Sequence, residues 1–122
     1  MSKKNLFEGM ELTDGMSLVL FERMKQLLTV SIEEDKSRNG SFQLIQASQV
    51  LSKLKMTISD EFEIPFGWNE DAWVKLCRKA YKERVIVAAA LLIAEIDRVA
   101  LMEAKGEKWD PTKKEESKKQ ES

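Results

Sequence analysis

The most regular feature of the chain is a run of ten apolar residues, 85–94, with charged residues on both sides. A helix that is apolar all round has to be buried on most of its circumference. Such a run spans about 15 Å of helix, half the thickness of a bilayer core, so it is too short to cross a membrane. The pattern predicts an all-α fold, a small helical bundle around a long apolar central helix over residues 81–103, with Gly106 as its C-cap.

Two segments nearer the N-terminus also carry apolar residues at helical spacing. The first is expected to be a helix over residues 13–35, with Thr13 at its N-cap, and the second a helix over residues 41–56. The turn between them is short and contains Asn39 and Gly40, which suit left-handed backbone angles. A short turn between two amphipathic helices predicts a two-helix antiparallel hairpin.

The segment that precedes the central helix has a different pattern. Residues 57–67 alternate apolar and polar side chains, and their proline and glycine indicate a loop with a short extended segment. Asn69 is well placed to cap one short helix over residues 70–79, whose acidic start and basic end suit the helix dipole. Trp73 and Leu76 are expected to face the core from this helix.

The two ends of the chain predict a three-part organisation. Residues 1–12 lack a clear periodicity and are expected to form a flexible arm, whereas residues 13–106 form the helical bundle domain. Residues 107–122 are expected to be a disordered charged tail, because their last ten positions contain no apolar residue that could be buried.

Composition excludes several classes of chemistry. The chain of 122 residues is 43% apolar and 34% charged, with a net charge of −1, so no global field points to nucleic acid or to a membrane surface. The sequence contains no histidine, which excludes Ser-His and Cys-His catalysis and histidine-ligated metals. Cys77 is the single cysteine and is expected to be a buried hydrophobe. The N-terminus lacks the apolar segment of a signal peptide, so the expected location is cytoplasmic.

The aromatic residues before the central helix have two interpretations. In the first, Trp68 and Trp73 pack onto the bundle as part of its core. In the second, they form a stacking platform for a nucleotide base, and Arg78, Lys82 and Arg84 bind its phosphates. The second interpretation predicts these five residues as a ligand-binding site.

The carboxylates near the end of the apolar run also have two interpretations. Glu95 lies on the same helical stripe as the apolar core and needs a partner, which Arg98 could supply as a structural ion pair. Alternatively, Glu95 could join Glu22 and Glu34 around a divalent cation, since Mg²⁺ prefers hard oxygen ligands. No cofactor other than Mg²⁺ is suggested.

Some of these stretches resemble a known group of proteins. Residues 65–73, followed by residues 84–98, look like the C-terminal half of a family of small helical proteins encoded by phages and prophages, mostly of unknown function. That half has a tryptophan-rich loop before a helix that ends in Ala-Glu-Ile-acidic-Arg. Glu22-Arg23 and the nearby Gln26 match a Glu-Arg pair and a glutamine in the family's N-terminal half. The histidine of its acidic turn is missing here. These proteins sit beside the MazG-like pyrophosphohydrolases, which bind Mg²⁺ through paired E-x-x-E and E-x-x-D motifs on two helices. The candidate carboxylates here do not have that spacing, because Glu95 and Asp97 are two residues apart and Glu33 and Glu34 are adjacent.

These observations lead to three functional hypotheses. The first is a non-enzymatic, phage-type accessory protein that binds a nucleotide-like ligand or a host protein. It would work as a homo-oligomer, because a chain of this size needs a partner to cover a fully apolar helix. The second is a Mg²⁺-dependent nucleotide pyrophosphohydrolase of the MazG kind. The third is a structural protein of a phage particle.

Overall fold

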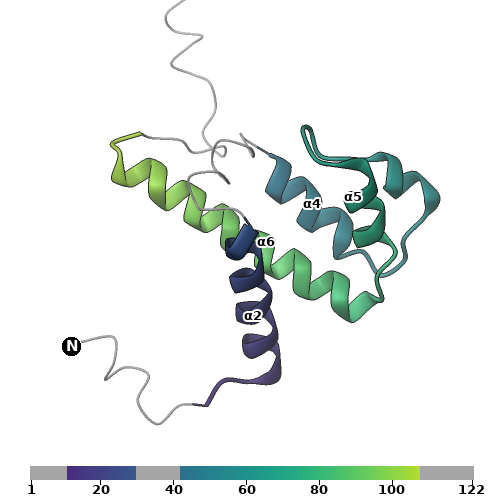
Figure 1. Cartoon of the computed structure of the whole chain (residues 1–122), viewed down its shortest axis with the longest axis horizontal. Coiled ribbons are helices and arrows are strands. Elements are labelled where there is room, and N and C mark those ends of the chain that lie inside the picture. The colour runs from purple at the N-terminus through teal and green to yellow at the C-terminus, as the bar shows by residue number, and fades with distance from the viewer. Residues whose placement is uncertain (1–10, 30–41, 108–122) are drawn as a thin grey trace, which may run out of the picture.

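The computed structural model describes residues 11–29 and 42–107, and every regular element within them is a helix (Figure 1). The elements in chain order are α2 (Asp14–Thr29), α4 (Gln43–Leu51), the 3₁₀ helix η1 (Ile58–Phe62), α5 (Glu70–Cys77) and α6 (Tyr81–Ala104). The expected all-α bundle is confirmed. Most of the predicted arm, nearly all of the predicted tail and the segment that joins α2 to α4 lie outside the described residues.

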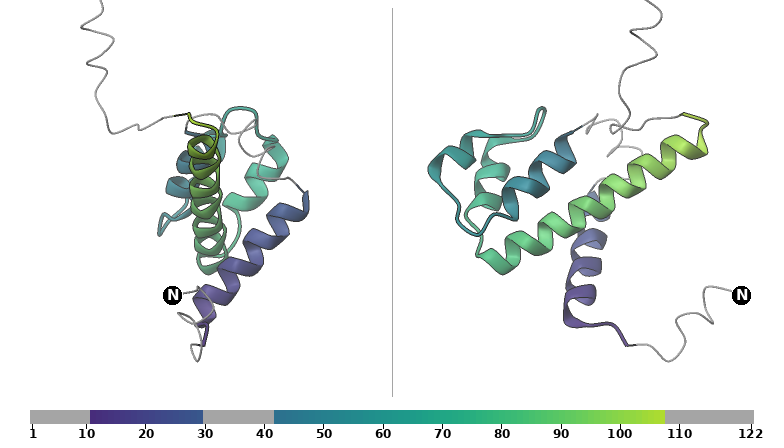
Figure 2. Two further views of the ribbon diagram at one scale, coloured as in Figure 1. Left: turned by 90° about the vertical axis from the view of Figure 1, so that its left-hand side faces the viewer. Right: turned by 180° about the vertical axis from the view of Figure 1, so that it is seen from behind.

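The longest helix, α6, is the common neighbour of the other two main helices. Both α4 and α2 make their extensive contacts with α6. Figures 1 and 2 show α4, α5 and η1 grouped at the N-terminal end of α6, while α2 crosses α6 and projects away from it. One side of α6 is therefore covered by α4, and a second side is covered where α2 crosses.

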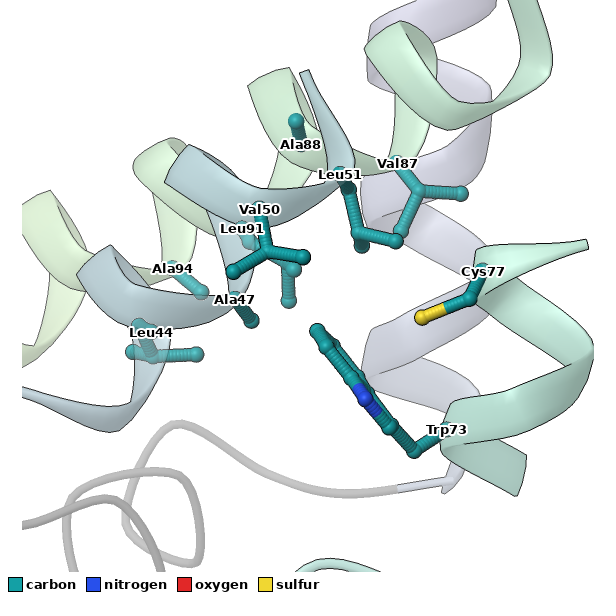
Figure 3. Packing of buried hydrophobic residues seen from close by; sticks show 10 residues of the cluster. All are labelled: Leu44, Ala47, Val50, Leu51, Trp73, Cys77, Val87, Ala88, Leu91 and Ala94. Atoms are coloured by element: carbon teal, nitrogen blue, oxygen red, sulfur yellow. The ribbon is translucent and has the colours of Figure 1, made fainter. Parts of the chain in front are cut away.

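The core lies where α4, α5 and α6 meet. Its members are small and medium-sized apolar side chains around one tryptophan (Figure 3): Leu44, Ala47, Val50, Leu51, Trp73, Cys77, Val87, Ala88, Leu91 and Ala94. Alanines on the facing sides of α4 and α6 allow these helices to approach closely, and the ring of Trp73 fills the space that α5 leaves beside them. The expectation that α6 is buried on most of its circumference is not met within one chain, because Leu92 and Ile96 are exposed.

Helix α4 is shorter than the helix predicted over residues 41–56. It ends at Leu51 instead of near Met56, and a buried arginine from α6 stabilises this early end by binding the carbonyl oxygen of Leu51 and those of residues that follow it. The guanidinium of Arg84 donates to the carbonyl oxygens of Leu51 and Lys53 at 2.8 and 2.7 Å. A cation at this position also suits the negative end of the helix dipole.

Residues 57–67 do not form the expected extended segment but contain the 3₁₀ helix η1. Its buried residue Asp60 accepts hydrogen bonds from the backbone N–H of Thr57 and from Nζ of Lys53, both at 2.7 Å. The backbone carbonyl of Asp60 accepts a further bond, 3.1 Å long, from Nε1 of Trp73. These bonds fold the chain into a tight turn around the carboxylate of Asp60 and connect η1 to α5. The alternation of apolar and polar residues in this segment therefore belongs to a turn and not to a strand.

The predicted helix caps are present. The side chain of Asn69 accepts a hydrogen bond from the N–H of Ala72 at 2.9 Å, and Thr13 accepts one from the N–H of Met16 at 3.2 Å. At the end of α6, Gly106 has a φ of 81°, and the N–H groups of residues 106 and 107 bond to the carbonyls of residues 103 and 102. This is a Schellman C-cap, which requires a left-handed residue such as glycine. Among the described residues, no helix has the length and apolar character that a membrane span requires.

Candidate functional site

A cavity bordered by the described residues lies between α2, α6 and α5. It has a volume of about 460 Å³, within the usual range for small-molecule sites. Its described lining comes from four helices and the loop before α5: Glu22, Arg23, Gln26, Thr29, Leu44, Gly67, Trp68, Asn69, Ala72, Leu76, Val87, Leu91 and Ala94. We refer to it as the α2 cavity.

The two sides of the α2 cavity differ in polarity. Helix α2 contributes only polar side chains, Glu22, Arg23, Gln26 and Thr29, whose spacing places them on one face of the helix. The facing wall, from α4, α5 and α6, is apolar. A surface helix usually turns its apolar face toward the core, and α2 does the reverse here.

The centre of the polar wall is a buried arginine. Nε and Nη2 of Arg23 donate to Oδ2 of Asp97 on α6 at 3.3 and 3.0 Å, and Nη1 donates to Oε1 of Gln26 at 3.2 Å. The ion pair ties α2 to α6 at their crossing. The bond to Gln26 also orients that amide, with its oxygen toward the guanidinium.

The two tryptophans of the predicted platform have different roles. Trp73 is completely buried, and its indole N–H is used within the fold, so its ring offers no face to a ligand. Trp68 is only partly buried and lines the α2 cavity. The rings meet edge to face, with centroids 6.0 Å apart. The core interpretation therefore applies to Trp73, whereas Trp68 is placed where a ligand could contact it.

The predicted phosphate-binding residues do not gather around Trp68. Arg84 is buried at the end of α4, with its guanidinium 5.5 Å from the ring of Tyr81. Arg78 forms a two-point ion pair with Glu61, in which both N–O distances are 3.1 Å. Lys82 is exposed near the start of α6. None of the three is among the described residues that line the α2 cavity, so they do not form one site with Trp68.

The two predicted metal ligands that the structure describes, Glu22 and Glu95, interact with different basic residues. Glu95 forms a two-point ion pair with Arg98, with both N–O distances at 2.8 Å, as the structural interpretation expects. Glu22 lies 3.5 Å from Nζ of Lys25. Glu34 lies outside the described residues. Within residues 11–29 and 42–107, no three acidic or cysteine side chains are grouped closely enough to hold a metal ion.

Cys77 is a core residue, as expected. Burial, together with the nearby carboxylates of Glu61 and Asp60, raises the pKa of its thiol to about 11. A thiol with such a pKa stays protonated at neutral pH and is a poor nucleophile.

Four polar residues of the α2 cavity were not predicted as site residues: Arg23, Gln26, Thr29 and Asn69. The sequence does contain a signal for the first three, because residues 22, 23, 26 and 29 form one polar helical face. Such a face is normally exposed to water, and only the packing of α2 turns it inward. Comparisons with protein-family models, curated proteins and solved structures give no match to this chain.

Proposed function

We propose that the protein is a non-enzymatic binding protein that takes a nucleotide-like ligand into the α2 cavity. The observation that carries this proposal is the orientation of α2, whose polar face lines the cavity. The Arg23–Asp97 ion pair and the bond from Arg23 to Gln26 allow α2 to present polar groups to an apolar wall without leaving the guanidinium unpaired. A ligand with polar edges can form further hydrogen bonds with this polar wall while its apolar faces contact the opposite one.

The lining suits a flat, polar and aromatic molecule. The ring of Trp68 offers a stacking surface, and stacking of a base on an aromatic side chain contributes about 1–3 kcal/mol. The polar side chains of Gln26, Thr29 and Asn69 border the same space and can read the edge of a base. The apolar wall opposite can cover the second face of the ring.

The charges of the cavity favour the base over the phosphates. The positive charge of Arg23 is balanced by Asp97, and Glu22 on the same wall adds a further carboxylate. The described lining therefore provides no surplus positive charge for a fully enclosed phosphate. We expect the base and sugar to enter the cavity and the phosphates to stay at its mouth.

The test is a thermal-shift and calorimetric titration with the common nucleosides and their mono- and triphosphates, with and without Mg²⁺. A ligand at a hundred times its Kd stabilises the folded state by about 2.7 kcal/mol, which is readily seen as a higher melting temperature. The informative variant is Ala72→Phe, because Ala72 is exposed and lines the cavity, so the new ring occupies the binding space. Ala104→Phe, at an exposed position near the end of α6, is the matched control.

We expect binding to be lost in Ala72→Phe and kept in Ala104→Phe. The proposal fails if no compound raises the melting temperature, or if Ala72→Phe binds as well as the wild type. Chromatography of the same mixtures separates binding from turnover. Release of pyrophosphate would support the MazG-like alternative. If none of the compounds binds, a protein partner is favoured. The resemblance to phage proteins stays a prediction.

A further inference from the structure

The face of α2 that points away from the cavity is apolar and exposed. It consists of Met16, Leu20, Phe21, Met24, Leu27 and Leu28, which share one side of the helix. Phe21, Met24 and Leu28 are exposed by 68%, 65% and 86%. A projecting helix of 16 residues is marginally stable in water without packing on its apolar side. This side of α2 therefore needs a partner.

A second apolar stripe runs along α6 on the side that α4 does not cover. Its members alternate at spacings of four and three residues: Val85, Ala89, Leu92, Ile96 and Val99. This is the heptad spacing of a helix that packs against another helix. Leu92 and Ile96 are exposed, and the other three are partly buried.

The two surfaces are connected. Met16, Val19 and Leu20 of α2 line a shallow groove together with Ile93 of α6. Ile93 lies four residues after Ala89 and three before Ile96 on α6, so the groove borders the α6 stripe and the apolar surface passes from one helix to the other. We call the six residues of α2 and the five of α6 the assembly face.

We propose that the assembly face docks a second copy of this chain, through packing of helix against helix about a twofold axis. None of its eleven residues is charged, and a twofold axis brings the same surface together from both chains. A partner with a charged surface would meet no complementary charge there. The same neutral face of a second chain can cover the assembly face without burying an unpaired charge.

The size of the assembly face also suits a dimer. The parts of α2 and α6 that carry the assembly face, residues 16–28 and 85–99, are about 20 and 22 Å long and about 10 Å wide. Their outer faces give a footprint of about 420 Å², about half of the roughly 800 Å² of accessible surface that each partner contributes to a standard interface, so the area suits a small dimer interface. Either helix alone falls well short of this area.

The rest of the chain has too few apolar residues to cover the assembly face. Outside the described ranges, residues 1–10, 30–41 and 108–122 contain four, two and one apolar residues. These seven apolar residues, spread over three segments, are too few to cover the eleven apolar residues of the assembly face. The proposal does not depend on the ligand of the α2 cavity, which lies on the opposite face of α2.

The test is sedimentation velocity and light scattering on the full chain over a wide concentration range. We expect the wild type to have twice the mass of the 14.0 kDa chain. Met24→Glu on α2 and Ile96→Glu on α6 should each raise the Kd of the dimer by about a hundredfold or more, because each places two carboxylates in one interface. Ile58→Glu is the control, since Ile58 is exposed by 75% on η1, away from the assembly face.

Circular dichroism shows whether each variant folds. If a Glu variant loses its helical signal, Met24→Gln and Ile96→Gln provide milder substitutions. A wild type that is monomeric at all concentrations overturns the proposal, and so do face variants that dimerise like the wild type. A monomer that is destabilised by Met24→Glu would instead identify the chain's own terminal segment as the cover, which also overturns it.

Discussion

The clearest prediction concerns Arg84, whose guanidinium holds together the end of α4 and the start of α6. The side chain is buried, and Nη1 donates to the carbonyl oxygens of Leu51 at 2.8 Å and Lys53 at 2.7 Å. Nε donates to the carbonyl of Lys79 at 3.1 Å, and Nη2 reaches that of Leu54 at 3.4 Å. One side chain thus satisfies four backbone carbonyl groups from two chain segments.

The variant Arg84→Met keeps an unbranched side chain of useful volume and removes all five donors. The carbonyl of Leu51 is buried and would lose its partner, which costs about 1–3 kcal/mol. The bond to Lys53 has a charged donor, and such bonds contribute about 1.5–3 kcal/mol, although this carbonyl can regain water. The weaker bonds and the favourable cation at the end of α4 add smaller amounts. We expect a loss of about 3–5 kcal/mol, a large part of the 5–15 kcal/mol that stabilises a typical domain.

The assay is urea denaturation at one fixed protein concentration, followed by circular dichroism and tryptophan fluorescence. Arg78→Met is the matched control, because the Arg78–Glu61 ion pair lies at the surface and such pairs contribute little. Arg84→Lys should fall between the two, since an ammonium group reaches fewer of the carbonyls. If Arg84→Met is no more destabilising than Arg78→Met, the assignment of Arg84 as the cap of α4 is wrong.

Two further predictions follow from the pKa values. The hydrogen bond from Lys53, followed by that from the Thr57 backbone, holds the pKa of the Asp60 carboxyl below its ordinary value. Because the pKa is lower in the folded state, this stabilisation is present at neutral pH and is lost as the pH falls below about 4. Urea denaturation should therefore show a weaker acid dependence in Asp60→Asn than in the wild type, and equal slopes would contradict the argument. The pKa of about 11 for Cys77 predicts that Ellman's reagent labels the native thiol far more slowly than the unfolded one. Rapid labelling of the native protein would mean that the core opens readily at α5.

Much of the secondary structure could be predicted from the sequence, because its determinants are local. The cap at Asn69, the glycine at residue 106 and the extent of α6 each depend on residues within one or two helical turns. The burial of Trp73 and Cys77 also agrees with expectation. The pair of Glu95 and Arg98 formed as expected because residues three apart on a helix are neighbours.

Only the tertiary structure decided the features that depend on distant partners. The early end of α4 is stabilised by Arg84, more than thirty residues away in the chain, and the turn of η1 depends on Lys53 and Trp73 as well as on Thr57. The candidate site depends on such contacts most of all. Helical spacing shows that α2 has one polar and one apolar face, but it does not show which face meets α6. The Arg23–Asp97 ion pair makes that choice across 74 positions of sequence, and it turns the polar face toward the cavity and the apolar face outward.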